Sequence, residues 1–416
     1  MNLKLLTLPA LLFASVLALA QPTPRPVPPD LPGNEAGQLL INEDPSVVQA
    51  RHAMEAARER AVALAAGSYE WTAKASLQRR REELGGANYR EWTAGIERAI
   101  RIGGKAGIDR ELGATHERLA KAQYGEARRE AARELLGFWM DWMAAERARQ
   151  LWLEQQQLAQ DNLAAVVRRR SAGDASLLEE NSARVDVAEV QRQLSTARNE
   201  EAKARARLRG HFPTLTLQLA QTAEPQQLDG EPGQWRERIL DESDELRVVR
   251  EEQRLATLQA ARARANRISD PTVGVYTSSE RGGSERIVGL SLSMPFGSAA
   301  RSASEREAAR LAEAAQAAVE AKQREIEAEV AQNLADAAGS LERWRFAQAA
   351  QAASRDSLRM TQRAYSLGES DLQSLLQARR QGVEAALGGE AARIDALRAH
   401  YRLLVDAHLI WGLQDE

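Results

Sequence analysis

The chain has 416 residues, of which 28% are charged, and its formal net charge of −3 comes from interleaved acidic and basic side chains. This balance argues against a nucleic-acid-binding protein, which would carry a segregated basic face. Because the sequence contains no cysteine, we expect a fold without disulfides and an N-terminus that carries no lipid on a cysteine.

Residues 1–20 have the pattern of a secretory signal peptide. Lys4 supplies the positive charge, an apolar run extends to Leu19, and Ala18 and Ala20 provide the small side chains of a cleavage site. We therefore expect an exported protein that begins at Gln21. Residues 21–43 are expected to form a Pro-rich N-terminal tether with an extended polyproline conformation.

The next 170 or so residues predict a helix, a hairpin and two further helices. Pro45 follows a capping Asp44 and begins a helix to Ala66. Apolar and polar residues then alternate, and a Gly-rich turn at 85–88 divides a hairpin over 69–102. Residues 105–170 lack proline and predict a helix about 100 Å long. Gly173 breaks it, and a second helix follows over 174–210.

The same order of elements returns after a segment with weak periodicity, residues 213–240. A helix is expected over 241–266, and a hairpin over 272–296 turns at 281–284. A long helix over 300–365 reaches Gly368, and a last helix runs over 371–409.

Residues 168–184 and 363–379 match at a fixed offset, which indicates a duplicated unit. The matching pairs are Arg168 and Arg363, Ser171 and Ser366, Gly173 and Gly368, Leu177 and Leu372, Ala183 and Ala378, Arg184 and Arg379. We therefore predict a mainly α fold with a small β part. A first repeat covers 44–212, an equatorial segment 213–240, and a second repeat 241–416.

The two hairpins need further partners, because an isolated hairpin is only marginally stable in water. Their alternating faces suit a transmembrane β-barrel to which each chain contributes four strands. The alternative is a soluble β-layer capped by helices. In a barrel, four aromatic residues are candidates for a girdle at the membrane edge: Tyr69, Trp71, Trp92 and Tyr276.

This order of elements resembles a TolC-type outer-membrane efflux protein, and it is most similar to the cobalt–zinc–cadmium branch of that family. The resemblance rests on residues 99–105 and 292–297 at the two hairpin exits, and on 171–173 and 366–368 at the two helix turns. It implies a homotrimer with a twelve-stranded barrel in outer-membrane lipid and a periplasmic tunnel of helices. It also implies a tripartite system with a periplasmic adaptor and an inner-membrane transporter.

No catalytic or metal-binding motif is present, and neither an enzyme nor a cofactor is expected. The histidines lack close ligand spacing: they are His52, His116, His211, His400 and His408. We expect an exit duct whose cargo, by branch resemblance, is heavy-metal cations driven by a proton-coupled transporter. Two alternatives stay open: an exported coiled-coil scaffold or adaptor without a pore, and an exit duct for type I secretion.

The two glycine turns are expected to form the periplasmic mouth. Family aspartates that constrict this end correspond to Ser374 and Gln377, which are not acidic, so nearby residues become constriction candidates: Asp174, Glu179, Glu369 and Asp371. The alternative is that these acids serve only to stabilise the helix dipole. The candidates for adaptor docking are Ser171, Gly173, Leu177, Ser366, Gly368 and Leu372, although a glycine also suits a tight turn with positive φ.

Overall fold

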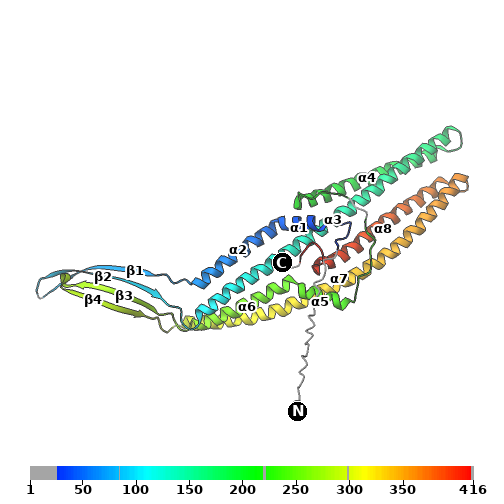
Figure 1. The fold of residues 1–416 in the computed structure, drawn as a ribbon. Helices are drawn as coiled ribbons and strands as arrows, with labels where there is room; N and C mark the ends of the chain where they lie inside the picture. Colours follow the sequence, from blue (N-terminus) through cyan, green and yellow to red (C-terminus); the bar gives the residue numbers. More distant parts are fainter. Residues whose placement is uncertain (1–25, 84, 219–221, 298, 414–416) are drawn as a thin grey trace, which may run out of the picture.

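The computed structural model describes residues 26–83, 85–218, 222–297 and 299–413 (Figure 1). The expected signal peptide lies outside this part of the chain. The elements, in order, are α1 Asn34–Glu43, α2 Pro45–Ala66, β1 Thr72–Arg81, β2 Asn88–Ala99, α3 Lys105–Ser171, α4 Leu177–His211, α5 Pro232–Glu242, α6 Asp244–Ala265, β3 Thr272–Glu280, the 3₁₀ turn η1 Arg281–Gly283, β4 Glu285–Ser293, α7 Ala299–Leu367 and α8 Leu372–Asp406.

The predicted duplication is confirmed. Each repeat has a helix, a hairpin, a very long helix, a glycine turn and a shorter helix, and the long helices α3 and α7 contain 67 and 69 residues. At 1.5 Å per residue, each is about 100 Å long. The two hairpins join in one antiparallel sheet of order β1-β2-β3-β4. Figure 1 shows this sheet at one end of the molecule and the α3–α4 and α7–α8 turns at the other.

The main apolar core lies midway along the helices. Trp139, Met140 and Met143 of α3 pack with the end of α8 and with Trp411 in the C-terminal segment, and all four side chains are almost fully buried. Buried apolar groups from both repeats therefore hold the long helices together at this level, although their hairpin and turn ends project far beyond it.

The expected tether over 21–43 is wrong in its second half. Residues 34–43 form α1, and Leu40 and Ile41 of this helix are buried in the core. Asp30 is also fully buried, and its carboxylate accepts hydrogen bonds from the Tyr401 hydroxyl at 2.7 Å and the Ala223 amide at 3.1 Å. The apolar residues after the prolines place residues 30–43 against the core, so this part of the arm is packed rather than extended. Residues 21–25 lie outside the described residues.

Several expected boundaries also differ. The segment 213–240 contains most of α5, whose Pro232 occupies the first turn, a position that tolerates proline. α4 begins at Leu177 rather than at 174, because Ser176 is its N-cap. β4 ends at Ser293 rather than at 296, since Pro295 has no amide to continue the ladder. α8 ends at Asp406, three residues early.

Candidate functional site

The sheet has one apolar and one polar face. Its register aligns Leu77 with Trp92, Ala75 with Ala94, and Ile96 with Val275 and Leu290, so these residues share the apolar face. Leu77 and Leu290 are 88% and 84% exposed. Among the described elements, none covers this face. A contiguous exposed apolar surface of this kind requires lipid or a partner.

The polar face carries the carboxylates of the strands. Glu97 pairs with Lys74 at 2.6 Å, and Glu91 pairs with Arg80 at 3.3 Å. Glu91 also accepts a hydrogen bond from Gln78 Nε2 at 2.7 Å and is nearly buried. Salt bridges and amides on one face with aliphatic groups on the other match the water-facing and lipid-facing sides of a transmembrane barrel.

The prediction that Tyr276 belongs to the aromatic girdle is wrong, because its side chain lies on the polar face. The register aligns it with Gly95 and Gly289 on the polar face, and its ring lies directly over Gly289, where a Cβ would meet it at 2.5 Å. A tyrosine ring that covers a strand glycine replaces the side-chain packing that this glycine lacks. It therefore faces away from the apolar surface.

The other aromatic candidates lie on the apolar side or at the base of the sheet. Trp71 and Trp92 are exposed, and the Arg98 guanidinium lies 5.7 Å from the centre of the Trp71 ring. Tyr69 instead donates a hydrogen bond to Asp270 at 2.8 Å, where the sheet joins the helices. Trp71 and Trp92 stay candidates for a girdle, whereas Tyr69 is tied to the junction.

At the opposite end, the two helix turns repeat the same geometry. Gly173 and Gly368 have φ values of 86° and 79°, which glycine adopts at little cost. Ser171 Oγ donates to the Arg168 carbonyl, and Ser366 Oγ donates to the Arg363 carbonyl, both at 2.7 Å. The sequence match between the repeats thus extends to individual hydrogen bonds.

The acidic candidates at the turns serve the helix starts. Asp371 is the N-cap of α8, and its carboxylate accepts hydrogen bonds from Ser374, which lower its pKa. Glu179 forms a capping box with Ser176 at the start of α4. Asp174 and Glu369 are exposed loop residues, and Ser374 and Gln377 are exposed on the first turns of α8.

The docking candidates differ between the repeats. Leu177 is 57% exposed, whereas its counterpart Leu372 is buried with Val166, Leu375 and Leu376. Leu372 therefore packs within the helical end of the chain and does not present a free surface. Ser171, Gly173, Ser366 and Gly368 are exposed, as a docking surface requires.

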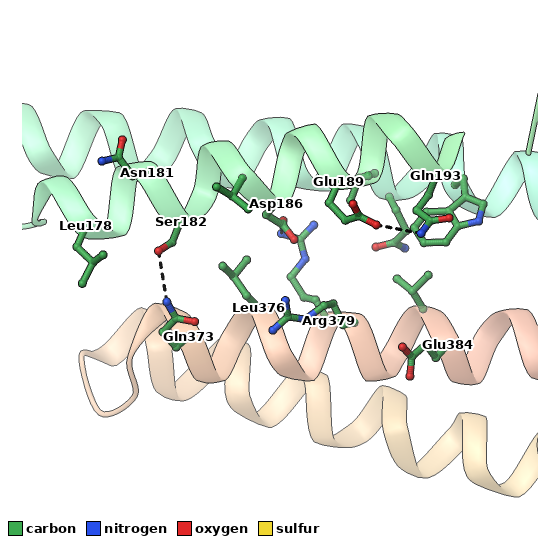
Figure 2. Close-up of a pocket in the computed structure, with 16 residues that line it drawn as sticks. Leu178, Asn181, Ser182, Asp186, Glu189, Gln193, Gln373, Leu376, Arg379 and Glu384 are labelled. Carbon is green, nitrogen blue, oxygen red and sulfur yellow. Dashed lines mark hydrogen bonds and ion pairs between the residues drawn. The ribbon is translucent and has the colours of Figure 1, made fainter. Parts of the chain in front are cut away.

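A groove of about 540 Å³ separates α4 from α8 near the turns (Figure 2). Arg379 of α8 reaches across it to Asp186 of α4 at 3.7 Å, and Gln373 donates to Ser182 at 3.3 Å. Burial raises the pKa of Asp186 and lowers the pKa of Arg379, so each group lies in a partly dehydrated site.

A third link joins the two hairpins closer to the turns. Arg169 of α3 donates to the Tyr365 hydroxyl at 2.6 Å and lies 5.3 Å from the centre of its ring. Sequence analysis missed all three links, since each joins residues about 190 positions apart. Glu180, another acid at the start of α4, is buried between Arg170 and Arg184, and hydrogen bonds from both arginines lower its pKa.

Comparison with known proteins identifies the family of this chain. The family model described as outer membrane efflux protein matches residues 36–211 and 235–404. The chain belongs to this family. The predicted TolC-type family is thereby confirmed, and the cobalt–zinc–cadmium branch stays a prediction. No curated protein matched the chain.

Solved structures support the fold. The outer-membrane channel OprN matches with 17% identity over 91% of this chain and 90% of its own, with a TM-score of 0.76. The CmeC outer membrane channel of Campylobacter jejuni matches with 13% identity over 99% and 96%, with a TM-score of 0.76. CusC matches with 16% identity over 94% and 95%, with a TM-score of 0.75.

Family membership gives the two ends of the molecule their places. The protein is an efflux channel, not an enzyme, with its sheet in the outer membrane and its helices in the periplasm. The alternatives of a soluble β-layer and of a scaffold without a pore are therefore wrong. The family implies a trimer that works with an adaptor and an inner-membrane transporter. Among the described helices, none has an apolar stretch long enough to cross a bilayer.

Proposed function

We propose that this channel is the exit duct of a tripartite system that exports heavy-metal cations, supplied by a proton-driven inner-membrane transporter. The main support for a duct is the exposed apolar face of the four-stranded sheet. Its edge strands, β1 and β4, each have one side without a hydrogen-bonded neighbouring strand among the described residues. When three such sheets close edge to edge into a barrel, the unpaired backbone groups of β1 and β4 form hydrogen bonds, and every apolar face points toward lipid. The cargo rests on the resemblance of residues 99–105 and 292–297 to the cobalt–zinc–cadmium branch.

The periplasmic entrance lies at the two glycine turns. The constriction candidates are Asp174, Glu179, Glu369, Asp371, Ser374 and Gln377, and the helix-capping bonds of Glu179 and Asp371 fix their carboxylates at the helix starts. Helix-start acids that line a ring would attract cations from the periplasm. The adaptor would contact Ser171, Gly173, Leu177, Ser366 and Gly368. The links Arg169–Tyr365 and Arg379–Asp186 hold the hairpins together in the present conformation.

A deletion strain tests the cargo. Loss of the gene should increase sensitivity to cobalt, zinc, cadmium or silver salts, and the intact gene on a plasmid should restore growth. A strain that becomes sensitive only to organic drugs would overturn the metal assignment and leave the duct intact. Loss of an exported protein from the medium, with unchanged metal tolerance, would favour the type I secretion duct.

Planar bilayers test the duct itself. The purified trimer should insert and conduct, and charge reversal of Asp371 and Glu179 together should alter conductance or cation preference. If both are unchanged, these acids only cap their helices.

A further inference from the structure

The end of the sheet that points away from the helices carries a cluster of four arginines on its apolar face. Arg79 and Arg81 lie on β1, Arg90 on β2 and Arg286 on β4. The register aligns Arg79 with Arg90, two residues beyond the Leu77–Trp92 pair. Arg286 lies two residues beyond Val288 on β4, and the register through Ser279 places it level with the Leu77–Trp92 pair. We call these four residues the arginine patch.

The acidic and basic residues of the strands are distributed unequally between the two faces of the sheet. Within the four strands, the apolar face carries no Asp, Glu or Lys, and its remaining charged residue, Arg98, lies at the helix end. The strand carboxylates Glu91, Glu97, Glu280 and Glu285 all lie on the polar face. The patch therefore has no carboxylate of its own face to neutralise it.

Arg80 provides an internal comparison. It lies between Arg79 and Arg81 but on the polar face, where it pairs with Glu91 at 3.3 Å and with Glu280 at 3.5 Å. The four patch residues are exposed, and none forms an ion pair with another residue that the structure describes. Arg79 and Arg90 are direct cross-strand neighbours, and like charges in this position destabilise a sheet. An anion outside the chain would relieve this repulsion.

The position of the patch identifies the anion. The helices lie in the periplasm, so the free end of the sheet points to the outer leaflet and beyond. At about 3.3 Å per residue along a strand, Arg79 and Arg90 lie about 7 Å beyond the last apolar pair. This is the level of lipid headgroups just outside the hydrocarbon region. The guanidinium group binds phosphate in a bidentate manner and is weakly hydrated, which suits it to this boundary.

We propose that the arginine patch is a binding site for phosphate-bearing lipids of the outer leaflet. In the trimer of the proposed function the sheets close edge to edge, so the patch occurs three times around the barrel. The site anchors the barrel at a fixed depth, and it is separate from the conduction path because it lies on the opposite face of the sheet.

Native mass spectrometry of the trimer in detergent tests the site with lipid A carrying two phosphates as the probe. Each arginine near such a surface contributes about fivefold to binding. Substitution of two, Arg79→Gln with Arg90→Gln, should therefore weaken binding by about 25-fold. The matched control Arg80→Gln, one residue away on the other face, should change binding by less than twofold.

Further arms separate lipid from free phosphate. Dephosphorylated lipid A should bind the wild-type trimer at least tenfold more weakly, and millimolar inorganic phosphate alone should not displace bound lipid A. Displacement by inorganic phosphate would overturn the lipid assignment in favour of a simple anion site. Equal binding of both forms of lipid A, or an equal loss in Arg80→Gln, would overturn the patch itself.

A variant that fails to assemble would not leave the question open. Arg79→Lys with Arg90→Lys keeps both charges, and it should retain binding within about fivefold. The wild-type trimer alone also gives a decisive result, because binding of bisphosphorylated lipid A should fall steeply as salt rises. Binding that is independent of salt would contradict the proposal.

Discussion

Lys105 and Asp270 form a buried ion pair where the sheet joins the helices, and its removal is the sharpest test of how the barrel is held on the tunnel. Lys105 Nζ lies 2.8 Å from Asp270 Oδ1 and 2.7 Å from the Ile268 carbonyl, and the two charged side chains are 2% and 5% exposed. Asp270 also accepts hydrogen bonds from the Ile102 amide at 3.0 Å and from Tyr69. The Asp270 carboxylate thus joins three segments: the first residue of α3, the residues that follow β2, and the residues that precede β3.

The expected cost follows from this geometry. At 2.8 Å and an effective dielectric constant near 20, the attraction of the two charges is about 6 kcal/mol, most of which offsets their dehydration. Lys105→Met removes the attraction, leaves the carboxylate buried and strips one donor from Ile268. We therefore expect a loss of about 3–5 kcal/mol in the free energy of unfolding.

Thermal unfolding of the trimer in detergent measures this loss. The control is Lys203→Gln, which breaks an exposed ion pair with Glu200 on α4 and should leave the midpoint nearly unchanged. The double variant Lys105→Met with Asp270→Asn should be more stable than Lys105→Met alone, because no charge is then left unpaired. Equal midpoints for Lys105→Met and Lys203→Gln would refute the assignment of the junction to this pair.

The same pair predicts a dependence on pH. Burial opposes ionisation of Asp270, but the hydrogen bonds from Lys105, Ile102 and Tyr69 outweigh it and hold its pKa below the usual range. A carboxyl whose pKa is lowered by folding stabilises the protein above its unfolded pKa of about 3.9, and this stability is lost as the pH falls through the folded pKa. Below about pH 4, wild type should therefore approach Lys105→Met in stability.

Three further predictions concern the two ends of the channel. Tyr365→Phe removes the hydroxyl that Arg169 binds. Because one such hydrogen bond contributes about 1 kcal/mol, single-channel recordings should show an open probability about fivefold higher. An unchanged open probability would mean that this hydrogen bond does not hold the channel closed. Leu290→Arg puts a charge on the apolar face, at a cost of about 2–4 kcal/mol near the bilayer midplane, and should lower the amount of trimer in outer-membrane fractions. Gly289→Val meets the Tyr276 ring and should reduce trimer yield, and pairing it with Tyr276→Ala should restore part of it.

The sequence predicted the order of elements because the signals that set it are local. Period-two alternation, the proline-free helices and Gly173 and Gly368 depend on neighbours along the chain, and the structure places each element within a few residues of its expected position. Helix α5 escaped prediction because its proline and glycine sit in its first turn, where they resemble loop residues. The packing of Asp30 against Tyr401 escaped because it joins residues 371 positions apart.

The site was less predictable than the fold for the same reason. Alternation alone assigns residues within one strand to two faces, but the face that Tyr276 shares with Gly95 follows only from the register between strands of different repeats. Likewise, the match of Arg184 with Arg379 gives no sign that they act differently. Arg184 pairs with Glu180 in its own helix, whereas Arg379 crosses to Asp186 of the other repeat.

This difference between equivalent residues bears on how the entrance works. If both repeats made the same contacts, the two hairpins would be interchangeable, and either could move to widen the mouth. Instead Leu372 is buried while Leu177 is exposed, and Arg379 points into the groove while Arg184 points along its own helix. The α7–α8 hairpin is therefore the one whose apolar and charged groups are engaged by the first repeat. Separation of the two hairpins breaks Arg169–Tyr365, Gln373–Ser182 and Arg379–Asp186 together, whichever hairpin moves, whereas the exposed Leu177 on α4 takes part in none of these links. The two duplicated hairpins have therefore diverged at a few side chains near their turns, and of the equivalent pair Leu177 and Leu372 only Leu177 keeps an exposed side chain.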